Sequence, residues 1–129
     1  MSDPAAFNRQ DILRIYGERP CCFITNLHSF VDLHHAVSRG FEHGVRPKNK
    51  ERKMFSSVFN CAPLQRNVHN SPLINQPLMR ALLLQTARKH VMNAVGCGSY
   101  ELNDHDRAFL LFSDEWIRDN LPPLFTNAI

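Results

Sequence analysis

Two short stretches decide the fold: VDLHHAV at 31–37 and NCAPLQRNVHN at 60–70. The first contains the adjacent histidines His34 and His35. The second opens on Asn60 and reaches His69 with eight residues between them. Imidazole nitrogens bind divalent cations, and they accept protons near neutral pH. These residue types are the ones that metal-assisted chemistry with a nitrogen base needs.

The residues around the histidine pair predict a hairpin. Residues 21–25 are apolar and partly β-branched, which favours a short strand. Residues 26–29 are predicted to form a turn and 30–35 a second strand that pairs with the first. Adjacent residues of a regular strand point to opposite faces, so His34 and His35 can serve one site only where the strand twists or ends.

The second stretch predicts a strand followed by a helix. Residues 55–59 are expected to be the strand, and Asn60 is expected to be the N-cap of the helix. Pro63 would lie in the first turn, where its missing N–H costs little. The helix would end before Pro72. It would bury an apolar face and carry Gln65 and His69 on a neighbouring face, the apolar residues being Cys61, Leu64 and Val68.

Helical patterns flank this central unit. A capping side chain and Pro4 predict a helix from the N-terminus to Tyr16, ended by Gly17. Residues 75–95 carry an apolar stripe that ends at two glycines, and Asn103 is expected to cap a last helix that stops before Pro122. The predicted fold class is α+β in one domain, 1–129, with an N-terminal helix (1–20), a central unit (21–72) and a helical extension (73–129).

Composition restricts the function classes. The chain has 129 residues, 43% of them hydrophobic, and no stretch approaches the ~20 apolar residues that span a bilayer. Charged residues within 1–20 argue against a signal peptide, so the cytoplasm or nucleoid of a host cell is the expected compartment. The formal net charge is only +3. The segment 38–53 nevertheless concentrates positive charge suited to a polyanion: Arg39, Arg46, Lys48, Lys50, Arg52 and Lys53.

The histidine pair, Asn60 and His69 resemble the HNH family of nucleases, over residues 22–70. The resemblance implies a ββα-metal core and a metal-dependent endonuclease that hydrolyses DNA phosphodiester bonds. It implies that His35 is the general base, that His34 and His69 are metal ligands, and that Asn60 fixes the loop and supports catalysis. Mg²⁺ or Mn²⁺ is the expected cofactor, with Zn²⁺ or Ni²⁺ as alternatives.

The resemblance also leaves positions open. Some family members carry a further histidine where this chain has Leu73, so only two ligands are firm. A third ligand is Asp32, Asn60, His28 or water. Gln65 is expected to contact phosphate or to orient a ligand.

The cysteines do not form a zinc ribbon like that of many HNH proteins. Thr25, Gln65 and Val68 stand where three of its four cysteines would be expected. The cysteines present are therefore expected to be free thiols, largely buried.

The resemblance implies cleavage that leaves a 5′-phosphate and a 3′-hydroxyl, and it is a resemblance to small nucleases of phages and mobile elements. One alternative is a structure-selective nuclease for branched recombination intermediates, which would favour a homodimer over a monomer. The exposed leucines Leu78, Leu82 and Leu83 are a candidate dimer surface. Another alternative is a catalytically inactive ββα module that only binds nucleic acid. RNA is an alternative substrate to DNA.

Overall fold

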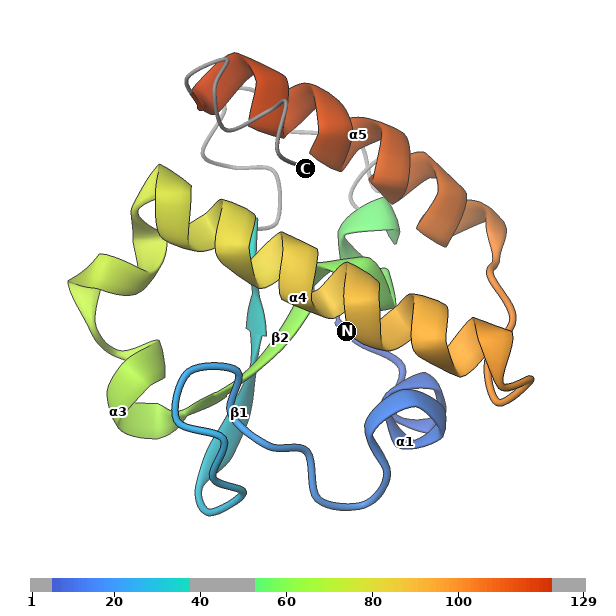
Figure 1. Cartoon of the computed structure of the whole chain (residues 1–129), viewed down its shortest axis with the longest axis horizontal. Coiled ribbons are helices and arrows are strands. Elements are labelled where there is room, and N and C mark those ends of the chain that lie inside the picture. The colour runs from blue at the N-terminus through green and yellow to red at the C-terminus, as the bar shows by residue number, and fades with distance from the viewer. Residues whose placement is uncertain (1–5, 38–52, 122–129) are drawn as a thin grey trace.

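The computed structural model describes residues 6–37 and 53–121, and within them the protein is α+β (Figure 1). The described residues form four α-helices, three short 3₁₀ helices and one antiparallel sheet of two strands. The elements in chain order are α1 (Arg9–Tyr16), β1 (Val31–His35), η2 (Lys53–Ser56), η3 (Val58–Asn60), β2 (Cys61–Gln65), α3 (Arg66–His69), η4 (Pro72–Asn75), α4 (Pro77–Gly96) and α5 (Asp104–Asn120).

The sheet pairs two segments that lie far apart in the sequence. β1 runs antiparallel to β2, with Val31 opposite Gln65 and His35 opposite Cys61. α3 follows β2 without a break and contacts both strands. The helix that carries His69 is therefore held over the strand that carries His34.

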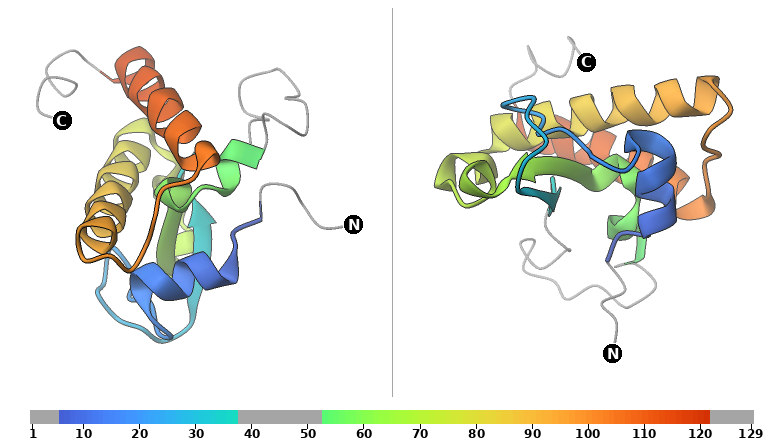
Figure 2. Two further views of the ribbon diagram at one scale, coloured as in Figure 1. Left: turned by 90° about the vertical axis from the view of Figure 1, so that its right-hand side faces the viewer. Right: turned by 90° about the horizontal axis from the view of Figure 1, so that it is seen from below.

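Two long helices complete the core. α4 contacts β2 and η3, while α5 contacts η2 and η3. In Figure 1, α4 crosses in front of the sheet, and in the left view of Figure 2 it lies to one side of the strands with α1 below. No helix among the described residues is long and apolar enough to cross a membrane. The one-domain organisation stays a prediction.

The predicted strand at 21–25 is wrong, and with it the predicted hairpin. This segment forms a turn in which Cys22 N–H donates to the Leu27 carbonyl (2.8 Å) and Asn26 N–H donates to the Cys22 carbonyl (2.9 Å). Asn26 takes a left-handed conformation with φ 61°, which asparagine tolerates better than most residues. The partner of β1 is β2.

The predicted order of strand and helix at 55–65 is also wrong. Residues 55–59 lie in the 3₁₀ helices η2 and η3 and at Ser57 between them, where the Ser57 hydroxyl caps η3 by accepting from Phe59 N–H. Residues 61–65 are the strand β2. Pro63 is tolerated there because β2 pairs on one side with β1, so one missing N–H disrupts little.

The predicted helix ends are confirmed at the C-terminus of α1, at the C-terminus of α4 and at the N-cap of α5. α1 ends at Gly17 as predicted but is capped by Asn8, whose side chain accepts from Gln10 N–H and Asp11 N–H. The predicted start near Pro4 lies outside the described residues. α4 ends at Gly96, close to the expected boundary. Asn103 caps α5 in a reciprocal capping box with Asp106.

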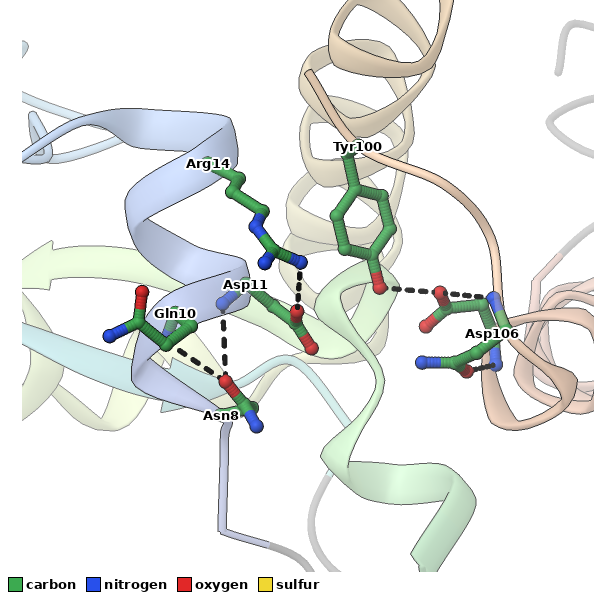
Figure 3. A network of polar contacts seen from close by, with 7 residues as sticks. Asn8, Gln10, Asp11, Arg14, Tyr100 and Asp106 are labelled. Atoms are coloured by element: carbon green, nitrogen blue, oxygen red, sulfur yellow. Dashed lines mark hydrogen bonds and ion pairs between the residues drawn. The ribbon is translucent and has the colours of Figure 1, made fainter. Parts of the chain in front are cut away.

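Asp106 also connects α5 to the rest of the core. Its fully buried carboxylate accepts from Ser57 Oγ (2.6 Å), Tyr100 Oη (2.7 Å) and Asn103 N–H (3.1 Å). Figure 3 shows Tyr100 pointing at Asp106, opposite the α1 cap where Asn8, Asp11 and Arg14 meet. This buried carboxylate therefore fixes Ser57, the residue between η2 and η3, and Asn60 is the last residue of η3.

Of the leucines predicted as a dimer surface, Leu83 is buried in the core, whereas Leu78 and Leu82 are exposed.

Candidate metal and nucleic-acid site

The structure brings together the two residues predicted to be metal ligands. His34 lies in β1 and His69 is the last residue of α3. Their ring centroids are 4.8 Å apart and the rings meet edge to face at 63°. The contact forms because β2 pairs with β1 and leads directly into α3. Two residues that are 35 positions apart in the sequence are therefore in contact in the fold.

His34 has a nitrogen suited to a ligand. Its Nε2 atom is buried and has no hydrogen-bond partner among the described residues. The pKa of His34 is lowered to about 4, mainly by burial and then, in decreasing order, by the nearby His69, Arg80 and His35. The imidazole is therefore neutral at neutral pH. A buried polar atom without a partner is costly, so this nitrogen is the kind that a bound cation or water would satisfy.

His69 is oriented by a carboxylate. Its Nδ1 lies 3.3 Å from Asp32 Oδ2, and Asp32 Oδ1 lies 3.5 Å from Arg66 Nη2. Hydrogen bonds from Arg66 and His69 hold the pKa of Asp32 below its usual range. A carboxylate on one ring nitrogen directs the other nitrogen toward a metal in many protein sites. Asp32, predicted as a third ligand or a supporting group, is placed as the supporting group of His69.

The donor set fits a divalent cation that keeps water in its shell. Within residues 6–37 and 53–121, no group of three or more His, Cys, Asp or Glu side chains is placed to hold a metal ion. Two imidazoles are borderline ligands compatible with several divalent metals. His34 and His69 would hold the cation, and water and substrate oxygen would complete its coordination.

Asn60 is a fully buried connector rather than the predicted helix N-cap. Its Oδ1 accepts from Val37 N–H (2.8 Å), and its Nδ2 donates to the carbonyls of Val37 (2.9 Å) and Phe55 (3.0 Å). The prediction that its amide bonds the backbone of the loop it closes is confirmed. It holds the chain just after the histidine pair against η2. The side chain is fully buried and both its oxygen and its nitrogen bond the backbone, which argues against metal ligation.

His35 has different neighbours from His34. It is the last residue of β1, and its ring stacks on Phe7 at 4.2 Å between centroids and 21° between planes. This difference follows from the alternation of side chains along a strand. His35 is nevertheless the last residue of the strand. The end of a strand is one of the two places where adjacent histidines can reach one site.

Gln65 serves a turn rather than the histidines. Its Nε2 donates to the Ser29 carbonyl (3.1 Å) and to Ser29 Oγ (3.2 Å), and its Oε1 accepts from Thr25 Oγ1 (2.8 Å). These contacts anchor the segment 25–29 to the end of β2. Gln65 therefore bonds Thr25 and Ser29, and none of these bonds orients a predicted metal ligand.

The predicted nucleic-acid-binding segment lies mostly outside the described residues. This applies to Arg39, Arg46, Lys48, Lys50 and Arg52. Lys53 is described, and it is the exposed first residue of η2.

Arg80 is a site residue that the sequence predictions missed. It is buried, and its guanidinium donates to the Asn75 carbonyl (2.9 Å), to Asn75 Oδ1 (3.2 Å) and to the Ala36 carbonyl (3.2 Å). Its charge helps to lower the pKa of His34. The sequence does contain a signal for this residue. Arg80 precedes Leu84 by four residues, so a charged side chain falls on the apolar stripe of α4.

Comparison with protein-family models, curated proteins and solved structures gives no match for this chain.

Acid is expected to destabilise the metal-free protein through His34. The pKa of about 4 lies below the ordinary 6.5, so between these values the unfolded chain binds a proton that the folded protein does not. The stability from neutral His34 is complete above the unfolded pKa and is lost as pH falls toward the folded one. Because solvent screens part of the effect, we expect a loss of about 1–2 kcal/mol.

Urea denaturation in EDTA at about pH 7.5 and about pH 5 measures this loss. His34→Gln, which cannot titrate, should lose less stability than the parent on acidification, whereas His105→Gln in α5 should behave like the parent. Equal acid sensitivity of His34→Gln and the parent would contradict the assignment.

Proposed function

We propose that this protein is a metal-dependent endonuclease of the HNH type that hydrolyses DNA phosphodiester bonds. The observation that carries the proposal is the contact of His34 with His69, in which one imidazole has an unpartnered buried nitrogen and the other is bonded to Asp32. The succession of β1, β2 and α3 supports the ββα-metal assignment, because it places both imidazoles between a strand and a helix end.

The chain's own residues divide the work. His34 and His69 would hold the cation, and Asp32 fixes the ring of His69. A divalent cation held there would polarise the scissile phosphate and stabilise the charge on the leaving 3′-oxygen. His35 accepts a proton from the attacking water. The water oxygen forms a bond to phosphorus, the bond from phosphorus to the 3′-oxygen breaks, and that oxygen takes a proton from solvent.

The remaining groups keep this arrangement in place. Asn60 holds the residues after His35 through Val37, and Arg80 bonds the Ala36 carbonyl from α4. Two independent elements thus fix the chain at the end of β1. Arg66, exposed and next to Asp32, is available to a flanking phosphate, and such contacts position DNA without reading its sequence.

Nicking of a supercoiled plasmid tests the proposal. We expect conversion to the nicked form with Mg²⁺ or Mn²⁺ and none with EDTA, and the nicked product should carry 5′-phosphate ends that DNA ligase reseals. A purified protein that binds the plasmid but never nicks it, with Mg²⁺, Mn²⁺, Ni²⁺ or Zn²⁺, would overturn the proposal in favour of a binding module. Faster cleavage of four-way junctions than of linear duplex would assign the nuclease to branched intermediates.

A further inference from the structure

Phe30 is displayed to solvent in a way that ordinary packing does not explain. Its side chain is 79% exposed, the highest value among the exposed large hydrophobic residues of the described chain. Its backbone is left-handed, with φ 52°. A bulky residue in this conformation is strained, and such outliers persist where the surrounding structure enforces them, often at binding sites.

The backbone around Phe30 is firmly held. The Phe30 carbonyl accepts from Arg66 N–H at 3.0 Å, and the preceding Ser29 is held through its carbonyl and hydroxyl by Gln65. Thr25 fixes the amide of Gln65 from the other side. The aromatic ring is therefore presented by a cross-linked turn rather than by a loose loop.

A groove of about 500 Å³ opens beside this ring. Its lining combines an aromatic face, a cation and carboxamides: Phe30, Gln65, Arg66, Asn67 and Asn70. The groove lies next to the candidate site, because Arg66, which lines it, contacts the same Asp32 carboxylate as His69.

This chemistry matches a nucleotide. An aromatic face stacks on a base, a guanidinium pairs with a phosphate, and carboxamides offer both donors and acceptors to base edges. A base inside a duplex has both faces covered by its neighbours, so a protruding ring must unstack paired bases to reach a base face there, whereas an unpaired base offers its face at less cost.

We propose that Phe30 stacks on an unpaired base of the nucleic acid and thereby positions the strand at His34 and His69. Arg66 contacts the adjoining phosphate, and Asn67 and Asn70 contact the edge of the base. The inference rests on the proposed function for its substrate class, and it adds a preference for DNA that is single-stranded, nicked or branched near the cut. Phe30 acts as a positioning residue.

Fluorescence anisotropy with a labelled thymidine oligonucleotide in EDTA tests the proposal without cleavage. One nucleotide at a time is replaced by an abasic site. The parent should lose about 5–150-fold in affinity when the stacked base is removed, and Phe30→Ala should lose a similar factor on the intact strand. Phe30→Ala should then lose nothing further at the abasic position, whereas Phe30→Trp should restore parental behaviour. Leu111→Ala, which also removes an exposed hydrophobic side chain, is the matched control and should bind like the parent.

The outcomes separate this inference from the proposed function. If Phe30→Ala binds the intact strand like the parent, or if its abasic penalty stays parental, Phe30 does not stack on a base. Metal-dependent plasmid nicking by the parent would still support the endonuclease in that case. Conversely, coupling between Phe30 and one abasic position in a protein that never nicks DNA would support the stacking contact and refute the nuclease.

Discussion

His35→Ala is expected to reduce the rate of DNA cleavage by about 10²–10⁴-fold, the usual contribution of a positioned general base. Metal affinity should change little, because in the proposed site the cation is held by His34 and His69 and the His35 ring stacks on Phe7. The loss of stability should be limited to that stacking contact. The adjacent variant His34→Ala should lose metal binding and cleavage together. The pair of variants therefore separates loss of proton transfer from loss of the cation.

Single-turnover cleavage at saturating Mn²⁺, combined with metal titration of each variant, measures this difference. His105→Ala, a histidine in α5, is the control and should cleave like the parent. Near-parental cleavage by His35→Ala would remove it from the role of base. Loss of metal binding by His35→Ala but not by His34→Ala would mean that the two roles are exchanged.

Asn60→Asp is expected to lower the free energy of unfolding by about 3–5 kcal/mol, although it preserves the shape of the side chain. The amide is fully buried, and its Nδ2 donates to two carbonyls, those of Val37 and Phe55. A carboxylate has no proton to donate, so two carbonyl oxygens would face a buried negative charge. Asn60→Ala should also destabilise the fold, because it leaves the same backbone groups without partners.

Urea denaturation in EDTA measures the loss, with Asn67→Asp as the matched control. Asn67 is exposed in α3, so the same chemical change there should stay within about 0.5 kcal/mol. If Asn60→Asp is as stable as the parent yet inactive, Asn60 acts in the chemistry directly and not as the connector described above.

Local signals predicted the helices, because capping and termination depend on residues a few positions apart. Asn103 with Asp106 and the glycine after Tyr16 define helix ends through contacts within one turn. The apolar stripe of α4 was likewise readable from spacing alone. Each of these features is fixed by neighbours in sequence.

Residues 61–65 show where such signals fail. Cys61, Leu64 and Val68 fit a helical spacing, and a proline in a first turn fits as well. The segment is a strand buried on both faces, so it lacks the alternation that identifies an amphipathic strand. Only its pairing with β1, about 30 positions away, decides its conformation. Residues 21–25 were predicted as a strand from their apolar and β-branched composition, but they form a turn, and β1 pairs with β2 instead.

The candidate site was half predictable. The resemblance selected His34, His69 and Asn60, and the fold brings the two histidines into contact. The contact of Asp32 with His69 and the bond from Arg80 to the Ala36 carbonyl depend on which helix end lies over which strand. Spacing in the sequence does not encode that arrangement.

Calorimetric titration with Mn²⁺ tests the central claim most directly, namely that His34 and His69 together hold a divalent cation. The parent and His105→Ala should bind one ion per chain with the same affinity. His34→Ala and His69→Ala should each bind much more weakly, and Asp32→Asn should weaken binding by about 10–100-fold, as expected for a group that orients a ligand. Parental affinity in both His34→Ala and His69→Ala would contradict the account.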